Sequence, residues 1–464
     1  MSQKNTLYIF RQDLRIHDNT WFIKACQQSE NVLPVFIFDT TILASFPANS
    51  AVVGFLIDAV NALDTALDAI GWKLLVLYGD PLDIIPNLVQ EYGIDAIYRN
   101  ESYGNGAVGR DALLIQRARN NNITYVPTSD YLLLPIDTIP QRKVFTPFYK
   151  LREKELLLNQ PTIQLAPKYI SLPKQNLVFP TTHQLSKQER KTTIPHGPNT
   201  HRPINGFKER YHSTNISMYD NRRNIPSCDG TSKLSPYIRF GIVSIREVYI
   251  WAKKQVDSWS YISELAWREF RQHIWFHFPN TRTSEFQEKR RGIQRDNNTS
   301  HFEAWKKGMT WYPLVDAAMR QLTTENRMHG RTRMVVASFL TKDLLIDRRR
   351  WEKHFADYLI DYDINVNVWN RQRSASVGAD PKPLRIFSPI LQSERFDPEC
   401  LYIKKRLPEL ASFSPTEIHN PTKFNLTHWG EWITGYPPPI IDHAIASRRA
   451  KEYYYASSTI EPHT

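Results

Sequence analysis

The sequence predicts an α/β domain with a doubly wound parallel sheet, followed by a larger all-α domain. Two observations support this prediction. Across residues 1–130, short β-rich apolar runs alternate with helical patterns, whereas the C-terminal part is helical almost throughout. Strands that alternate with helices imply right-handed βαβ units and therefore a parallel sheet. We divide the chain into an α/β domain at residues 1–135, an interdomain linker at 136–205 and a helical domain at 206–464.

Five short runs in the first domain have the length and the β-branched or aromatic content of buried strands. The longest helix is expected over Ala51–Ile70, where apolar residues recur on one face. The predicted strands are Leu7–Phe10, Val32–Asp39, Leu74–Tyr78, Ala96–Tyr98 and Ile123–Val126, and the other predicted helices are Pro81–Tyr92 and Asp111–Asn120.

The stretch from Leu156 to Pro203 is rich in Pro, Gln, Thr and Lys and has few apolar runs, which is typical of a long surface linker. Helical spacing of apolar residues returns after it. The clearest predicted helices there are Ser244–Lys254, Trp259–Phe278, Tyr312–Thr323, Arg331–Leu345 and Trp351–Asp361.

Charge is distributed unevenly in this chain, whose formal net charge is +12. Residues 1–130 contain 9 Lys and Arg against 14 Asp and Glu, so the remainder contains 50 basic and 33 acidic residues. A basic C-terminal part indicates a polyanionic partner such as nucleic acid. A generally solvated basic surface is the alternative interpretation.

Other classes are disfavoured by composition. The three cysteines, Cys26, Cys228 and Cys400, are far apart and odd in number, so they form neither a disulfide framework nor a zinc pattern. No apolar run has the length of a membrane span, and the N-terminus lacks the apolar core of a signal peptide. We therefore expect a cytoplasmic protein without a metal site or a membrane partner.

One glycine motif suggests a different function. Gly104–Gly109 fits G-x-G-x-x-G, follows a predicted strand and precedes Asp130 by about twenty residues, as in dinucleotide-binding proteins. The motif follows the fourth strand, however, whereas this fingerprint normally follows the first. A simple structural turn is the favoured interpretation, and an NAD(P) oxidoreductase is kept as a minor alternative.

Several residues in the C-terminal part suit a large anionic ligand. Thr231–Ser235 offers hydroxyl groups, a cation and backbone N–H groups just before a helical run, although an ordinary helix cap has the same pattern. Glu264, Trp267 and Arg268 share one helical face, which is more often a packing surface than a site. Arg333, Asp361 and Asp363 fit either a ligand site or a structural ion-pair cluster.

Longer motifs in order resemble the photolyase/cryptochrome family, most closely the class I cyclobutane-dimer photolyases. The resemblance covers nearly the whole chain and is weakest in the linker. The motifs are LYIFRQDLRIHDN near the start, VFTPFYK at Val144–Lys150, DGTSKLSPYIRFG after Tyr219, SELAWREF at Ser263–Phe270, and the block from Gly308 to Leu410.

This resemblance implies an FAD held in the helical domain and light-driven electron transfer from reduced FAD to a pyrimidine dimer flipped out of DNA. Trp267 would stack on the dimer, Met334 would pack against it, and Glu264 would stabilise the charged dimer, whereas Asn367 would face the flavin N5. The implied FAD-binding residues are Tyr219, Thr231, Ser232, Lys233, Leu234, Ser235, Glu264, Arg268, Arg333, Asp361, Asp363 and Asn367.

The chain departs from the family where electron transfer is concerned. Members usually have three tryptophans between flavin and surface, and here Arg371 and Arg348 stand at the inner and middle positions, which leaves Trp305 as the outer one. Because arginine is not oxidised to a useful radical, the usual relay should be interrupted. Trp369 and Trp351 are possible substitutes.

The lesion pocket and the antenna site also differ from the family. Gly330 replaces an asparagine and Arg327 a tryptophan, while Arg373 stands where a second stacking tryptophan is expected and can stack on a base itself. With Trp267 and Arg331, Arg373 completes the predicted DNA contacts. The antenna chromophore is open between folate, deazaflavin and none.

The sequence thus predicts a monomeric photolyase acting on single- or double-stranded DNA that contains pyrimidine dimers. The alternative is a cryptochrome-like blue-light receptor, or a repair-deficient paralogue that binds FAD.

Overall fold

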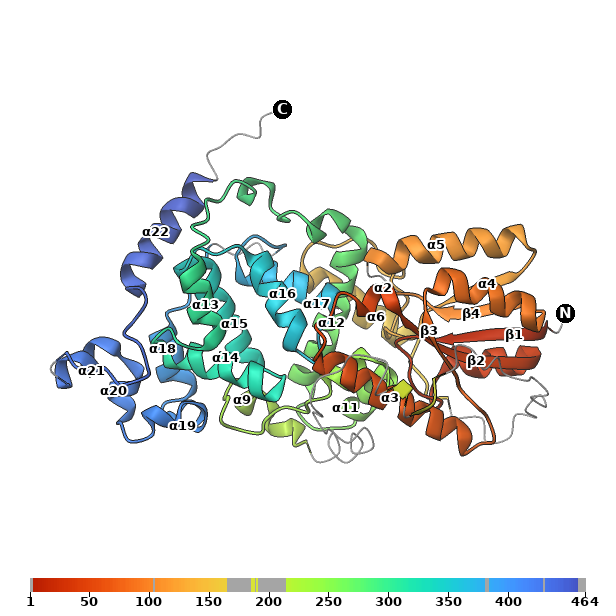
Figure 1. The fold of residues 1–464 in the computed structure, drawn as a ribbon, viewed down its shortest axis with the longest axis horizontal. Coiled ribbons are helices and arrows are strands. Elements are labelled where there is room, and N and C mark those ends of the chain that lie inside the picture. The colour runs from red at the N-terminus through yellow and green to blue at the C-terminus, as the bar shows by residue number, and fades with distance from the viewer. Residues whose placement is uncertain are drawn as a thin grey trace. The chain divides into compact units, whose positions relative to one another are not determined.

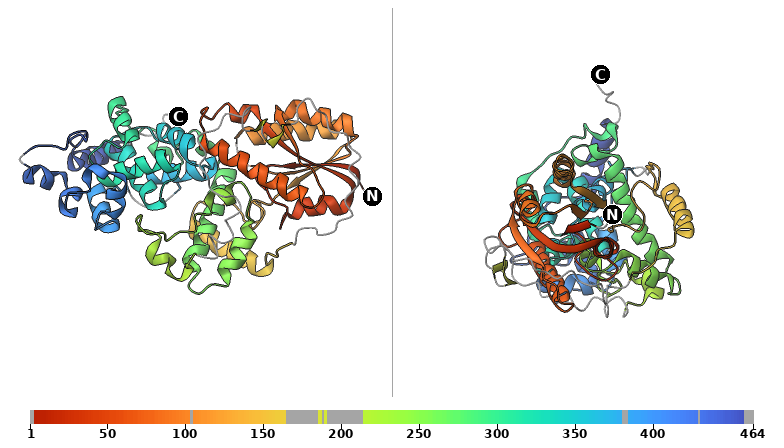
Figure 2. Two further views of the ribbon diagram at one scale, coloured as in Figure 1. Left: turned by 60° about the horizontal axis from the view of Figure 1, so that its bottom comes forward. Right: turned by 90° about the vertical axis from the view of Figure 1, so that its right-hand side faces the viewer.

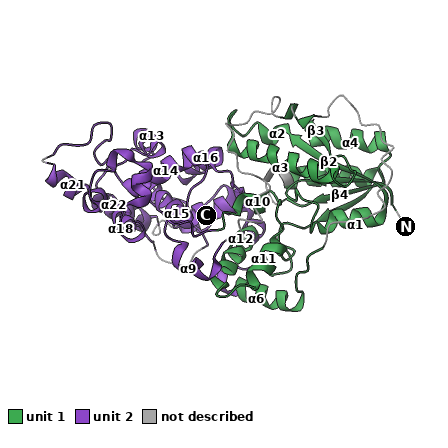
Figure 3. Ribbon diagram, turned by 90° about the horizontal axis from the view of Figure 1, so that it is seen from below, with its two compact units in different colours: residues 1–140, 148–213, 232–272 green, residues 141–147, 214–231, 273–464 purple. Residues whose placement is uncertain are grey.

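The computed structural model describes residues 3–102, 105–164, 185–187, 189–190, 214–379, 384–428 and 430–457. The chain forms two compact units (Figure 3). The first unit contains residues 1–140, 148–213 and 232–272, and the second contains residues 141–147, 214–231 and 273–464. The boundaries of these units differ from those of the three predicted segments, because residues 232–272 group with the α/β domain.

The first unit is built on a five-stranded sheet with the order β3-β2-β1-β4-β5, in which every neighbouring pair is parallel. All five predicted strands are confirmed. Helices cover both faces of this sheet, with α1 and α3 on one side and α4 and α5 on the other (Figure 2). The strands are β1 Gln3–Phe10, β2 Ser29–Asp39, β3 Leu75–Gly79, β4 Ala96–Asn100 and β5 Thr124–Thr128.

The helices around the sheet begin and end where local chemistry favours it (Figure 1). Asp80 caps α4 by accepting a hydrogen bond from the Leu82 N–H at 2.8 Å, and Gly93 ends α4 with a φ of +55°. The helices of the N-terminal half are α1 Thr20–Gln28, α2 Thr40–Leu43, α3 Ala51–Asp68, α4 Pro81–Tyr92, α5 Asn105–Asn120 and α6 Phe145–Leu158.

Helices make up most of the remaining described chain. The core of the second unit includes the fully buried side chains of Trp305 and Trp311. The helices are α9 Tyr219–Arg222, α10 Ser235–Arg239, α11 Ile245–Lys253, α12 Trp259–His277, α13 Thr299–Lys307, α14 Pro313–Glu325, α15 Gly330–Ser338, α16 Arg348–Tyr358, α17 Ile364–Ser374, α18 Pro389–Phe396, α19 Leu401–Arg406, α20 Pro415–His419, α21 Pro421–Thr427 and α22 His443–Ala456.

The largest departures from the predicted elements concern α5, α6 and the helix predicted over Arg331–Leu345. Helix α5 starts at Asn105, six residues before the predicted start at Asp111, and α6 lies inside the predicted linker. The predicted helix Arg331–Leu345 divides into α15 and a π-helical turn, Phe339–Asp343. Among the described residues, no helix is long and apolar enough to cross a membrane.

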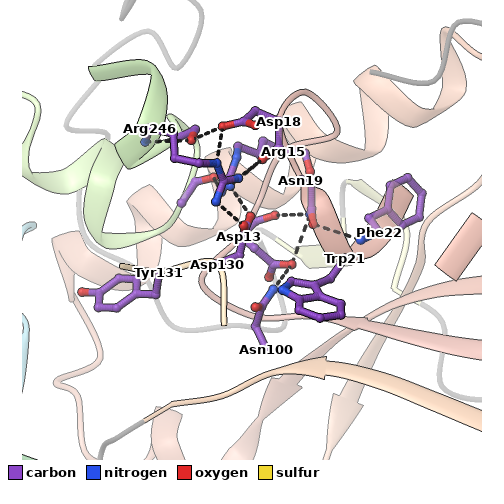
Figure 4. Close-up of polar contacts among 12 residues, drawn as sticks. Asp13, Arg15, Asp18, Asn19, Trp21, Phe22, Asn100, Asp130, Tyr131 and Arg246 are labelled. Carbon is purple, nitrogen blue, oxygen red and sulfur yellow. Dashed lines mark hydrogen bonds and ion pairs between the residues drawn. The ribbon is translucent and has the colours of Figure 1, made fainter. Parts of the chain in front are cut away.

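A buried ionic network lies at the carboxyl ends of β1 and β5 (Figure 4). Asp130 forms ion pairs with Arg15 and, at 2.7 Å, with Arg246. Arg246 also pairs with Asp18 at 3.0 Å, and Asp18 accepts a hydrogen bond from the Ser244 hydroxyl. The side chains of Asp18 and Asp130 are fully buried. The network therefore fastens α11 to the loop after β1.

This network also bears on the glycine motif. Gly104 lies outside the described residues, while α5 does begin within the motif, directly after β4. Asp130, which a dinucleotide site would place on a ribose hydroxyl, is buried in ion pairs with two arginines. The structure thus favours the structural interpretation of the motif over the NAD(P) alternative.

Replacing Asp130 with Ala should destabilise the protein strongly. The change leaves two buried guanidinium groups short of one carboxylate, and breaking a buried ion pair in this way costs about 3–5 kcal/mol. The free energy of unfolding in urea measures the effect. The matched control is Asp68→Ala at the exposed end of α3, where a change within about 0.5 kcal/mol is expected. Equal effects of the two changes would contradict the assigned role of the network.

Candidate functional site

The predicted pair between Arg333 and Asp361 is present in the structure. The Arg333 Nη2 group donates to both carboxylate oxygens of Asp361, at 3.0 and 2.9 Å, and its Nε group donates to the Met328 carbonyl at 2.9 Å. The Asp361 side chain is only 8% exposed. A guanidinium held at two points is rigid, so α15 presents a fixed charge pair.

Two further residues of the predicted site lie at the start of α17. Asp363 is buried and caps the helix by accepting hydrogen bonds from the N–H groups of Asn365 and Val366, at 3.0 and 3.4 Å. The Asn367 side-chain amide donates to the Asp363 carbonyl at 3.0 Å. That bond uses Nδ2 and fixes the amide plane, so Asn367 Oδ1 is the group suited to accept a hydrogen bond from a ligand N–H.

The predicted phosphate-binding segment has an unusual backbone. Lys233 has a φ of +55°, which is uncommon for a residue with a side chain, and it leads into the short helix α10. Ser232 is buried and accepts a hydrogen bond from the Tyr261 hydroxyl at 2.9 Å. Burial raises the pKa of Tyr261 to about 12, so this phenol stays a donor at neutral pH. Leu234 is buried, whereas Ser235 is exposed.

Helix α12 places Glu264, Trp267 and Arg268 within little more than one turn, and all three are half-buried. Trp267 packs edge-on against Phe270 with 5.7 Å between ring centroids. Arg268 lies 3.9 Å from the centroid of the Tyr131 ring and donates to the Tyr131 carbonyl at 3.0 Å. The second terminal nitrogen of Arg268 is buried and has no hydrogen-bond partner among the described residues. An anionic ligand would satisfy it.

The two arginines at the relay positions are buried in ion pairs. Arg348 is fully buried and its Nε group pairs with Glu285 at 3.1 Å, while Arg371 is 1% exposed and pairs with Glu352. Burial and the positive charge of Arg348 lower the pKa of Arg371 to about 8. Sequence analysis missed both glutamates. The need of a buried guanidinium for a carboxylate was the signal that could have prompted a search for them.

Trp305 does not lie where the sequence predicted. The relay interpretation made it the outer, solvent-side tryptophan, but its side chain is fully buried in the core of the second unit. Its Nε1 group donates to the Val336 carbonyl at 3.2 Å, and its ring stacks with those of Phe302 and Phe355. A buried indole of this kind is a packing residue rather than a surface exit for charge. Trp351 packs against the same Phe355.

The predicted DNA contacts come mainly from arginines supported by aromatic rings. Arg331 lies 4.2 Å from the Phe396 ring centroid and donates to the Asn224 side chain at 2.6 Å. Arg373 lies 5.3 Å from the Trp369 ring. Such rings hold guanidinium groups in place while leaving part of them available.

The remaining predicted site residues lie on α9, just before α10 and on α15. Tyr219 is half-buried with Arg223 over its ring, Thr231 accepts from Arg327 at 3.5 Å, Met334 is half-buried on α15, and a Cβ added to Gly330 would meet no atom within 4 Å.

Comparison with known proteins identifies the family of this chain. The sequence profile described as the FAD-binding domain of DNA photolyase matches residues 261–456, and the one described as DNA photolyase matches residues 6–168. The chain is 35% identical to the deoxyribodipyrimidine photo-lyase of Synechococcus sp., with 97% of this chain and 96% of that protein covered. It is 32% identical to the Escherichia coli protein of the same name, with 97% and 98% covered.

Solved structures give the same picture at the level of the fold. A bacterial class III photolyase from Agrobacterium tumefaciens superposes with a TM-score of 0.86 and 30% identity, covering 99% of each chain. A Synechocystis cryptochrome has a TM-score of 0.87 and 25% identity, covering 98% of this chain and 99% of that one. Because similar structures include a class III photolyase and a cryptochrome, they do not assign the class, and the resemblance to class I stays a prediction.

Acid should destabilise α15 through His329. The His329 Nδ1 atom caps this helix by accepting from the Arg331 N–H at 3.2 Å, and burial together with nearby arginines lowers the His329 pKa to about 4. In the unfolded chain the pKa is about 6.5. The unfolded state therefore binds more protons between these values, and stability falls as the pH falls through this window.

At pH 5 the loss from this one group should reach about 2 kcal/mol relative to pH 7. Urea unfolding at both pH values, for the wild type and for His329→Asn, isolates the effect, because asparagine also caps helices but does not titrate. An equal loss in both proteins would show that His329 is not its source.

Proposed function

This chain belongs to the photolyase/cryptochrome family, and on that premise we propose that it is a light-driven, FAD-dependent enzyme that repairs cyclobutane pyrimidine dimers in DNA. The observation that supports the proposal best is the pairing of Glu264 and Trp267, an acid and an indole one turn apart on α12, both only half-buried. An aromatic face and a hydrogen-bonding acid are what a flipped-out dimer requires.

FAD fits the described residues on two grounds. The buried, unpartnered nitrogen of Arg268 calls for an anionic oxygen, and the oriented amide of Asn367 suits the N–H of a reduced flavin ring. In our proposal the hydroxyl-rich segment that includes Ser232 holds the phosphates, while Arg333 and Asp361 act beside the flavin. The full set is the one predicted from the sequence, from Tyr219 to Asn367.

When bound and reduced, FAD would supply the electron that opens the cyclobutane ring under blue light and would take it back once the ring has opened. The protein's own residues then have three tasks. Trp267 stacks on the dimer, Met334 packs against it, and Glu264 hydrogen-bonds to it and stabilises the charge it gains. Arg331 and Arg373 contact DNA phosphates or bases without reading sequence.

A cryptochrome-like receptor is the second candidate. The ion pairs of Arg348 and Arg371, in place of relay tryptophans, and the missing side chain at Gly330 favour it. Both candidates bind FAD, so only the fate of the dimer separates them.

Purified protein should repair a thymine dimer when its flavin is first reduced chemically in the absence of oxygen. Blue light and a dimer-containing oligonucleotide complete the reaction, and recovery of thymine absorbance measures it. A protein without Trp267 should bind this oligonucleotide about 1–3 kcal/mol more weakly, since that is the contribution of one stacked base. If thymine absorbance does not recover in a fully reduced, FAD-loaded sample, the receptor interpretation is favoured.

The change Gly330→Asn should improve repair without loss of stability. Space for the new side chain exists, because an added Cβ meets no atom within 4 Å. One further hydrogen bond of about 0.5–1.5 kcal/mol would raise the repair rate between about twofold and tenfold. Gly330→Ala is the matched control, since it adds the Cβ without the amide. Equal rates for the two variants would exclude a role for the amide.

A further inference from the structure

Four arginines of the second unit lie near one another. Arg331 and Arg395 share the ring of Phe396, with their guanidinium groups 4.2 and 5.2 Å from its centroid. Partial burial, together with the positive charges of Arg223, Arg385 and Arg395, lowers the pKa of Arg331 to about 10. We call these four residues the arginine cluster. Arg223 also has a loose contact with Asp220, at 3.8 Å.

Like charges placed together repel one another, so something must hold them. Arg331 and Arg395 lie on α15 and α18, whose backbones are fixed by their own hydrogen bonds. Arg385 is different, because it is exposed on the non-helical segment Leu384–Ser388. Its guanidinium group lies 4.8 Å from the Phe387 ring centroid.

Two buried side chains bind the backbone of that segment. The Lys342 ammonium group, in the π-helical turn after α15, donates to the Arg385 carbonyl. One turn earlier, the Ser338 hydroxyl accepts from the Phe387 N–H at 3.3 Å. Lys342 is 2% exposed and Ser338 is fully buried. The segment is therefore held at alternate residues by one face of the helix that carries Arg331.

Burying the charged Lys342 side chain at this position is energetically unfavourable. Its burial lowers its pKa to about 7, and the Arg385 carbonyl is its only hydrogen-bond partner among the described residues. The neighbouring carboxylate of Asp343 is already paired with His443. A buried cation without its own carboxylate destabilises a fold. The presence of Lys342 is therefore better explained by its hydrogen bond to the Arg385 carbonyl than by a contribution to stability.

We propose that Lys342, with Ser338, is a positioning residue for DNA binding: it fixes the segment Leu384–Ser388 so that Arg385 joins the arginine cluster against the phosphate backbone. This inference rests on the proposed function, because it assumes that the second unit binds DNA. The contact supplies affinity and salt dependence but no sequence preference, as phosphate contacts do.

The test measures binding of the FAD-loaded protein to a dimer-containing duplex over a series of salt concentrations. Removing one phosphate contact lowers the slope of log affinity against log salt by about 1. Arg385→Ala should show this loss directly. Lys342→Met should show the same loss, and the double variant should lose no more than Arg385→Ala alone, because both changes remove one contact.

Lys353→Met is the matched control, since it removes an equal charge from the exposed Lys353–Asp357 pair of the same unit, and its slope should stay unchanged. A lysine with a purely structural role would lower the unfolding temperature but leave the slope of the folded protein intact, and that result would overturn the proposal. Additive losses in the double variant would overturn it too.

Two further outcomes are distinguishable. If Lys342→Met does not fold, Ser338→Ala decides instead, because it removes the second contact with the segment and should lower the slope in part. A wild-type protein that binds FAD but no DNA at any salt concentration refutes the DNA-binding function, and with it this inference.

Discussion

The strongest constraint on this structure is the cost of burying charge. An isolated guanidinium group loses several kcal/mol of hydration when it leaves water, and only a carboxylate at close range offsets that loss. In both units, the most deeply buried arginines form ion pairs with carboxylates. The pairs are Arg15–Asp130, Arg152–Glu269, Arg348–Glu285 and Arg371–Glu352. The first three join elements distant in sequence, whereas Arg371–Glu352 joins the consecutive helices α16 and α17, and together the pairs help to determine which segments pack against one another.

The same constraint explains which elements sequence analysis found. Strands and helices that bury apolar residues at a regular period were predicted closely, with α4 matching at both ends. Helix α6 was assigned to a linker because its buried face contains Arg152 between Phe148 and Leu156, so that the apolar period is interrupted. The residue that stabilises this helix, Glu269, lies 117 positions away. No local pattern reveals a partner so distant.

The candidate site shows a similar limit. The resemblance identified Arg333 and Asp361 as a pair because both belong to long, ordered motifs. Their contact is present in the structure. It could not show that Arg268 lies against Tyr131, or that the tryptophan assigned to the surface, Trp305, is buried. Position in a motif predicts residue type and neighbourhood, whereas burial depends on which side chains fill the space around it.

Replacing an indole with an ion pair changes what an interior can do without changing its fold. An indole can lose an electron, whereas the ion pair of Arg371 with Glu352 cannot. The pair also places fixed charges where the family has a neutral ring. Under the proposed function, the residues assigned to the flavin and the flipped dimer on α12, α15 and α17 are retained, and electrons would have to reach the flavin by a route other than this relay. Under that proposal, Arg348 and Arg371 alter the supply of electrons, whereas Gly330, Arg327 and Arg373 alter the lesion pocket.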